Sequence, residues 1–237
     1  MPAKPLPVDL FVELVADSGV PVLFFDTAAI LDIVRCAYRP DLRLDLLRSA
    51  AAACAASKAV PGRQLWLAAT PTVLKELADN RCGVLEELDK AISRTLREIG
   101  RFAEVARVLS ASKAAAPDWL NDELQTGIVE LMNRLMTALT VYEGSASCVA
   151  RAYDRVRHGL APASRGKQEM KDCVIFEEFL EMAEGLTAMG FARPRVFITP
   201  NDRDFGKPPE GRVCDDLVRV GANYVSNLSW AAHLIGP

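Results

Sequence analysis

The chain has 237 residues, of which half are hydrophobic and a quarter are charged, and its formal net charge is −3. This composition is ordinary for a globular protein with a sizeable core, and the charge argues against a protein whose whole surface binds polyanions. The length is large for one domain and small for two, so we expect one domain with an insertion or a small appendage.

The cysteines and the apolar segments predict a cytoplasmic protein with no membrane partner. Six cysteines stand singly, without a second member at metal-site spacing: Cys36, Cys54, Cys82, Cys148, Cys173 and Cys214. Cysteines scattered in this way are typical of reduced, mostly buried thiols. No segment approaches the length of a membrane span, and the first residues, with an acid by position 9, lack the pattern of a signal peptide.

The first third of the chain predicts two buried strands, each followed by a helix. The apolar run at 22–25 lies between Pro21 and Asp26, which is typical of a strand buried on both faces. The residues after Asp26 place apolar side chains at helical spacing. The other elements expected here are a short helix at 8–17, an alanine-rich helix at 41–59, a strand at 65–69 and a helix that starts at Thr70-Pro71.

The middle of the chain is predicted to be nearly all helical. Apolar residues recur every three or four positions, and Pro117 breaks the first stripe. The expected helices are residues 84–113, a helix from Asp118 or Asn121 to Gly144, and a more basic helix at 145–158. These helices are too many for one crossover connection. We therefore expect a helical insertion at 81–159, packed on a core made of residues 1–80 and 160–237.

The last third of the chain returns to alternating helices and strands. Its expected elements are a loop at 160–168, a long helix from Asp172 to Gly190, a strand at 195–199, a short helix at 213–219 and a strand at 223–227. Strands that alternate with helices predict a parallel sheet covered on both faces. The expected fold is a three-layer α/β/α structure with a central parallel sheet of about four to five strands.

Acidic residues stand at the ends of the predicted elements. Asp26 follows the first strand, Glu76 lies in the helix after the second, and Asp172 starts the long helix. Asp202 and Asp204 follow the third strand. The carboxyl ends of parallel strands meet at one edge of a sheet, where ligands bind, and clustered carboxylates need cations between them. Oxygen ligands without Cys or His favour Mg²⁺ or Mn²⁺ over Zn²⁺, and such sites commonly perform phosphoryl transfer.

Each acid also has a purely structural explanation, as a helix cap or a surface residue. Asp26 and Thr27, for example, both accept hydrogen bonds well from the free N–H groups in the first turn of a helix. Other catalytic schemes have little support. The chain has only two histidines, and it lacks a G-x-S-x-G motif, a Gly-rich phosphate loop and an H-E-x-x-H motif.

Four segments of the chain resemble the ordered motifs of the PIN and PIN-like nuclease superfamily: FFDTAAILDIV, VLKEL, KDCVIFEEFLEMAEG and VFITPNDRDF. The resemblance covers about residues 20–80 and 165–227, and it implies a nuclease that cleaves RNA with the help of Mg²⁺ or Mn²⁺. Carried over to this chain, the implied catalytic and metal-binding residues are Asp26, Glu76, Asp172 and Asp204, with Thr27, Thr199 and Asn201 in supporting positions.

Two departures from the family pattern leave details open. The last motif, ITPNDRDF, fits T-x-N-x-x-D-F without a gap, which favours Asp204 as the fourth ligand and keeps Asp202 as a candidate. Glu76 and Asp172 are 96 positions apart, which is more typical of larger PIN-like proteins than of the small toxins of toxin–antitoxin pairs. Two kinds of protein partner stay open from the sequence. One is a second copy of the chain, and the other is a protein inhibitor or antitoxin.

A basic stretch leads directly into Asp172 and offers a path for RNA. The residues predicted to contact the phosphates are Arg155, Arg157, Arg165, Lys167 and Lys171. The alternative is that this stretch is simply a solvated face of the protein.

The sequence therefore predicts a metal-dependent ribonuclease, and two alternatives stay open. The first is a PIN-like scaffold that binds RNA or protein without cleaving anything. The second is a phosphatase that forms an aspartyl phosphate at Asp26. This second alternative is the weaker one, because Ala28 replaces the second acid of the usual D-x-D motif.

Overall fold

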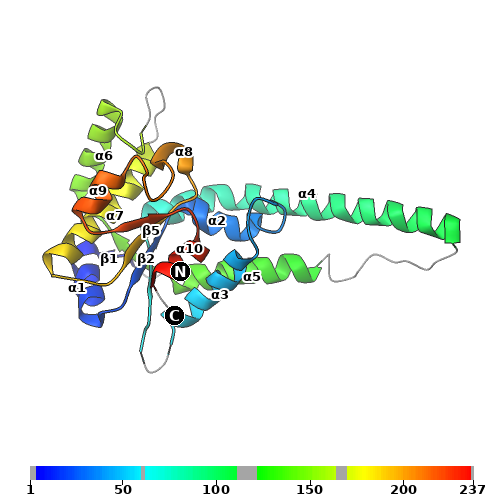
Figure 1. Cartoon of the computed structure of the whole chain (residues 1–237), viewed down its shortest axis with the longest axis horizontal. Coiled ribbons are helices and arrows are strands. Elements are labelled where there is room, and N and C mark those ends of the chain that lie inside the picture. Colours follow the sequence, from blue (N-terminus) through cyan, green and yellow to red (C-terminus); the bar gives the residue numbers. More distant parts are fainter. Residues whose placement is uncertain (1–3, 60–61, 111–121, 164–169, 236–237) are drawn as a thin grey trace.

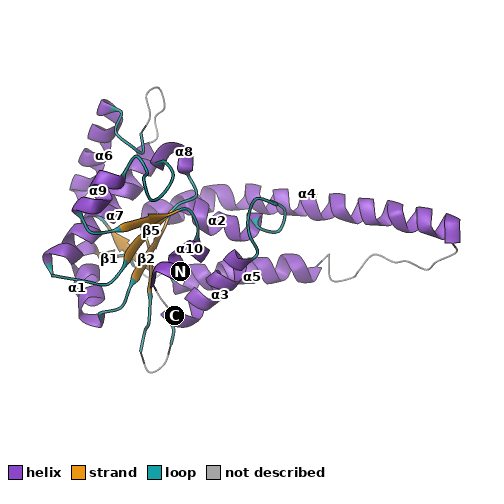
Figure 2. Cartoon of the chain, viewed as in Figure 1, coloured by secondary structure: helices purple, strands orange, loops and turns teal. Residues whose placement is uncertain are grey.

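The computed structural model describes residues 4–59, 62–110, 122–163 and 170–235, and within them six parallel strands form one sheet (Figures 1 and 2). The strands are β1 (Leu6–Pro7), β2 (Val22–Phe25), β3 (Trp66–Ala69), β4 (Thr140–Glu143), β5 (Arg195–Ile198) and β6 (Asn223–Val225). Their order across the sheet is β1-β4-β3-β2-β5-β6. The strands β3 and β2 therefore occupy the middle of the sheet.

Helices cover both faces of this sheet (Figure 1). They are α1 (Val8–Ser18), α2 (Thr27–Arg35), α3 (Asp45–Ser57), α4 (Pro71–Ser110), α5 (Asp122–Ala138), α6 (Ala146–His158), α7 (Met170–Ala188), α8 (Asp202–Phe205), α9 (Cys214–Arg219) and α10 (Leu228–Ile235). On one face α7 packs against α1 and α6, and on the other α2 packs against α4 and α5. The predicted three-layer α/β/α fold is confirmed. No helix in the described part of the chain is long and apolar enough to cross a membrane.

The strand β4 corrects the predicted end of the helix that precedes it. Residues 140–143 lie inside the sheet, paired with β3 on one side and β1 on the other. The sequence predicts a helix that continues to Gly144, whereas α5 ends at Ala138. The reason is that the Thr-Val-Tyr sequence of β4 prefers an extended, half-buried backbone. Residues 140–143 therefore belong to the core sheet, whereas the division of the chain into a core and an insertion at 81–159 stays a prediction.

The helix α4 joins two predicted helical segments into one. It runs for 40 residues from Pro71, through the apolar stripe that starts at position 84. Its first half packs on α2, and its second half projects well beyond the sheet and its covering helices (Figure 1). The predicted break at Pro117 lies outside the described residues. The helical middle of the chain is thus partly core and partly a projecting arm.

A cluster of aromatic rings fills the space between the sheet and α7. Phe197 on β5 lies 5.7 Å from Phe24, 5.1 Å from Phe179 and 5.2 Å from Phe205 between ring centroids. All four side chains are fully buried. Contacts of this kind stabilise the core through apolar burial and through the edge or offset arrangement of the rings.

Replacing Phe197 by alanine is expected to lower the free energy of unfolding by about 3–5 kcal/mol, because it removes buried surface and leaves a cavity. Urea denaturation of the variant and the wild type measures this change. The matched control is Tyr153→Ala on α6, where the ring is exposed and the expected loss is small. Equal losses in the two variants would contradict this account of the core.

Candidate active site

The parallel sheet brings the residues that follow its central strands to one edge. Asp26 comes directly after β2 and caps the N-terminus of α2, where its Oδ1 accepts a hydrogen bond of 2.7 Å from the Thr27 N–H. Thr199 comes directly after β5, and its hydroxyl donates a 2.7 Å hydrogen bond to Oδ2 of Asp26. Both oxygens of this buried carboxylate are therefore held in fixed positions.

Thr27 joins Asp26 to the second predicted acid. Its hydroxyl donates a hydrogen bond of 2.7 Å to Oε2 of Glu76, on the second turn of α4, and lies 3.4 Å from the carbonyl oxygen of Val73. A hydroxyl has a single proton to donate, so the shorter contact with the charged carboxylate is the stronger one. Glu76 is thereby fixed beside the start of α2.

Asn201 joins the third predicted acid to the same edge. Its Nδ2 donates a 3.3 Å hydrogen bond to Oδ2 of Asp172, which lies in the first turn of α7. The backbone N–H of Asn201 donates to the Thr199 hydroxyl oxygen at 3.2 Å. A chain of hydrogen bonds thus runs from Asp172 through Asn201 and Thr199 to Asp26.

Most of these side chains line one cleft with a volume of about 470 Å³, which Thr199 does not border. Three of the four predicted acids contribute to it, as do Thr27 and Asn201; the lining residues are Asp26, Thr27, Ala28, Leu31, Asp32, Arg35, Arg39, Asp41, Leu42, Glu76, Asn80, Asp172, Pro200 and Asn201. Asp204 is buried in α8 and does not line the cleft. Asp202 does not line it either, and it accepts a 3.4 Å hydrogen bond from the Tyr224 hydroxyl.

The electrostatics of the cleft disfavour the charged form of its central acid. Burial raises the pKa of the Asp26 carboxyl to about 6, and the nearby charge of Glu76 adds to this increase, while the hydrogen bond from Thr199 opposes it. A cation placed between the two carboxylates would reverse this effect, because it favours the ionised form of both.

The acids fit a hard divalent cation in their chemistry, although they are not gathered tightly around one point. Asp26, Glu76 and Asp172 offer only oxygen donors, which Mg²⁺ and Mn²⁺ prefer. Among the described residues, however, no three carboxylate, histidine or cysteine side chains are close enough to form a ready metal site. Binding a cation would therefore have to draw these carboxylates closer together.

Two arginines of the cleft were not predicted from the sequence. Arg35 and Arg39 line it together with the acids, and each already pairs with an acid in its own segment. The Arg35 guanidinium lies 3.2 Å from Asp32, and that of Arg39 lies 2.9 Å from Asp41. The sequence did contain a signal for Arg35. Thr27, Leu31 and Arg35 follow one another at steps of four residues, which places all three on one face of the predicted helix.

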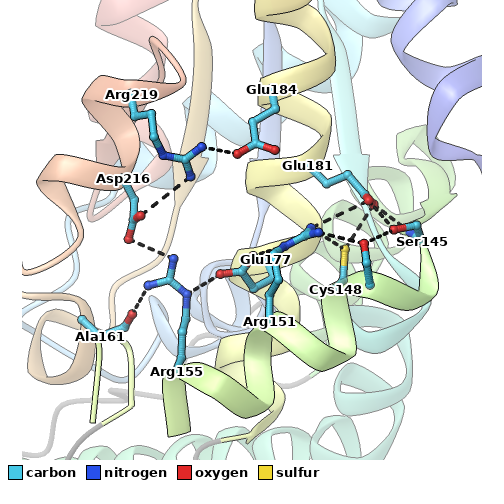
Figure 3. Close-up of polar contacts among 11 residues, drawn as sticks. Ser145, Cys148, Arg151, Arg155, Ala161, Glu177, Glu181, Glu184, Asp216 and Arg219 are labelled. Atoms are coloured by element: carbon cyan, nitrogen blue, oxygen red, sulfur yellow. Dashed lines mark hydrogen bonds and ion pairs between the residues drawn. The ribbon is translucent and has the colours of Figure 1, made fainter. Parts of the chain in front are cut away.

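The structure places Arg155 in a buried group of ion pairs, whereas its contact with phosphate stays a prediction. The side chain is buried and turned inward. Figure 3 shows its guanidinium between three elements, where it pairs with Glu177 of α7, lies 2.9 Å from Asp216 of α9 and donates to the Ala161 carbonyl at 2.6 Å. The guanidinium carbon also lies 5.0 Å from the centroid of the Phe176 ring. Arg155 therefore ties α6 to the core.

The other residues of the basic stretch differ in their placement. Arg157 is exposed on α6. Lys171, beside Asp172, is also exposed, and its ammonium lies 4.0 Å from Asp79 of α4. Arg165 and Lys167 lie outside the described residues. Among the residues predicted to bind phosphate, Lys171 is the one next in sequence to a residue of the cleft, Asp172.

An all-parallel α/β fold with carboxylates in a cleft at the carboxyl edge of its sheet is typical of a ligand or nuclease site. A family model described as the PIN domain matches residues 23–205. The match covers more than half of the chain, so the chain belongs to the PIN domain family, whose members are in general nucleases that use divalent metals. No curated protein and no solved structure gave a match.

Proposed function

We propose that this protein is a metal-dependent ribonuclease that hydrolyses RNA phosphodiester bonds at the cleft described above. The observation that carries the proposal is the convergence of Asp26, Glu76 and Asp172 on one cleft at the carboxyl edge of a PIN domain. Asp204 completes the proposed ligand set on the strength of its motif, and Asp202 remains the alternative.

The proposed roles follow from the hydrogen bonds of the site. Asp26, Glu76 and Asp172 would hold Mg²⁺ or Mn²⁺, which when bound supplies positive charge for the phosphodiester and lowers the pKa of a water. Thr199 and Thr27 orient the carboxylates of Asp26 and Glu76 through their hydroxyls. These hydrogen bonds hold the two carboxylates in the cleft before a cation binds, so the cation has to draw already oriented ligands closer together.

The proposed substrate contacts are with phosphate groups rather than with base edges. Arg35 and Arg39 already line the cleft, and Lys171 lies beside Asp172. The carboxylates that pair with Arg39 and Lys171 are exposed, so an RNA phosphate could take their place at low cost, whereas Arg35 pairs with the buried Asp32 and would keep that partner. Binding through such contacts should weaken as the salt concentration rises.

The test of this function is cleavage of a labelled single-stranded RNA by the full chain, with Mn²⁺ or Mg²⁺ and with a chelator. We expect cleavage only with the metal, and we expect Glu76→Gln to reduce the rate by about 100-fold. Glu86→Gln is the matched control, because Glu86 is an exposed residue of the same helix. A parallel assay on single-stranded DNA tests whether cleavage is confined to RNA.

Two outcomes would contradict the proposal. Cleavage that persists in the chelator, or that Glu76→Gln and Glu86→Gln reduce equally, would show that the cleft is not its source. A chain that folds normally yet neither binds Mn²⁺ nor cleaves RNA would instead favour the scaffold that was the alternative from the sequence.

A further inference from the structure

The outer half of α4 carries large apolar side chains into solvent. Phe102 is 76% exposed, Val105 is 40% exposed and Leu109 is 80% exposed. Figure 1 shows this part of α4 extending past the start of α5 and past the body of the molecule. A helix gains most of its stability from packing an apolar face, and clustered exposed apolar residues mark interaction sites. The outer half of α4 therefore presents a face suited to a partner.

The same face of α4 forms one wall of a groove in the middle of the helix, before the exposed outer half. This groove has a volume of about 640 Å³, and its apolar walls include Leu42, Leu44, Leu88, Ala91, Ile92 and Leu124. Thr95 and Glu98 of α4 line it as well. The positions 91, 95, 98, 102, 105 and 109 alternate in steps of four and three, which places them all on one side of the helix. One continuous stripe thus lines the groove and then runs out along the arm.

We propose that the occupant of this surface is a second copy of the chain, with the two α4 helices paired in antiparallel orientation about a two-fold axis near Gly100. In this arrangement Leu109 of one copy lies opposite Ala91 of the other, and Val105 lies opposite Thr95. The tip of each arm fills the groove in the middle of the other helix. The paired segments, residues 91–109, span about 27 Å at 1.5 Å per residue.

Self-complementarity favours a second copy over an unrelated partner. The apolar tip and the apolar groove lie on one helix face, so a two-fold axis satisfies both at once in each copy. Steps of four and three are the pattern of helices that pair along their length. The charges also fit this antiparallel register. Glu98 of one copy lies beside Arg101 of the other, and the two-fold axis generates the same contact a second time. Both side chains are exposed in the single chain.

This pairing places the second copy beside the acidic cleft. Arg39 and Leu42 line both the groove and the cleft. The partner's helix tip would therefore border one end of each cleft without contributing an acid to it. The inference does not depend on nuclease activity, since it concerns association of the chain in the absence of metal and RNA.

The first test is sedimentation of the full chain in a chelator, at a chain concentration of about 50 µM. We expect a dimer, and we expect Leu109→Glu to raise the dissociation constant by about 30-fold or more. Arg107→Glu is the matched control, because Arg107 is exposed, lies two positions before Leu109 and therefore faces the opposite side of the helix. Circular dichroism checks that both variants keep their fold. A monomeric wild type, or equal weakening by the two variants, would overturn the proposal.

The second test checks the register through a charge exchange. Glu98→Arg and Arg101→Glu should each weaken the dimer, because each places two like charges beside each other across the axis. The double variant restores opposite charges and should recover most of the affinity. A double variant that is weaker than both single variants would exclude this antiparallel register and the proposed pairing with it.

Discussion

Replacing Asp26 by asparagine is expected to abolish metal-dependent RNA cleavage and, at the same time, to stabilise the metal-free protein at neutral pH. Catalysis is lost because the central carboxylate of the cleft is removed. Stability rises because the wild type must keep a buried charge beside Glu76, which asparagine does not carry. The Thr27 N–H and the Thr199 hydroxyl can still hydrogen-bond the amide that replaces the carboxylate.

The pH dependence of this effect has a definite sign. The pKa of Asp26 is raised from 3.8 to about 6 in the folded protein, so the folded state binds the proton more tightly than the unfolded state does. Protonation of Asp26 stabilises the folded state. This stabilisation is fully present below pH 3.8 and is lost as the pH rises through about 6. At pH 7 and above the loss amounts to about 3 kcal/mol, which Asp26→Asn should largely recover.

Urea denaturation in a chelator at pH 5 and pH 8 measures this difference. The advantage of Asp26→Asn over the wild type should be larger at pH 8, whereas Asp17→Asn on the exposed surface of α1 should show none. Excess Mn²⁺ should reverse the order, because only the wild type gains stability from the bound cation. An Asp26→Asn variant that gains the same stability from Mn²⁺ as the wild type would remove Asp26 from the metal site.

Every strand that the sequence predicted is found, the one at 223–227 as β6, and the clearest signals come from strands whose environment is uniform. β2, β3 and β5 are buried on both faces, so each appears in the sequence as a run of apolar residues, which in β5 follows Arg195. β4 lies next to the edge strand, and only Tyr142 of its four residues is buried. Its pattern therefore merged with that of the preceding helix. β1 has two residues and is too short to give a pattern.

In the candidate site, the features that could be predicted are those that depend on residues close together in the sequence. The positions of Asp26 and Asp172 at the ends of elements could be predicted, because a strand end and a helix start are local features. The inward turn of Arg155 could not, because its partner Glu177 lies 22 positions further along the chain and meets it only when α6 packs on α7. The role of Asp204 stays a prediction from its motif, since the described cleft does not include it.

Replacing Arg155 by methionine is expected to lower the free energy of unfolding by about 3–5 kcal/mol. The substitution keeps an apolar stem that can pack on Phe176, but it removes the charge between Glu177 and Asp216 (Figure 3). Glu177 is buried, so the loss leaves its carboxylate with Arg151 as its remaining ion-pair partner among the described residues. A buried charge that loses a partner costs far more than an exposed one.

Arg157→Met is the matched control, since Arg157 is exposed two positions further along the same helix, and its expected change is within about 0.5 kcal/mol. Urea denaturation measures both variants. The KM for RNA, measured where Arg155→Met is still folded, separates the two roles considered for this residue. An arginine that binds phosphate raises the KM when it is removed, whereas one that ties α6 to α7 and α9 leaves the KM unchanged and lowers only the stability. A raised KM with unchanged stability would support the role first predicted from the basic stretch.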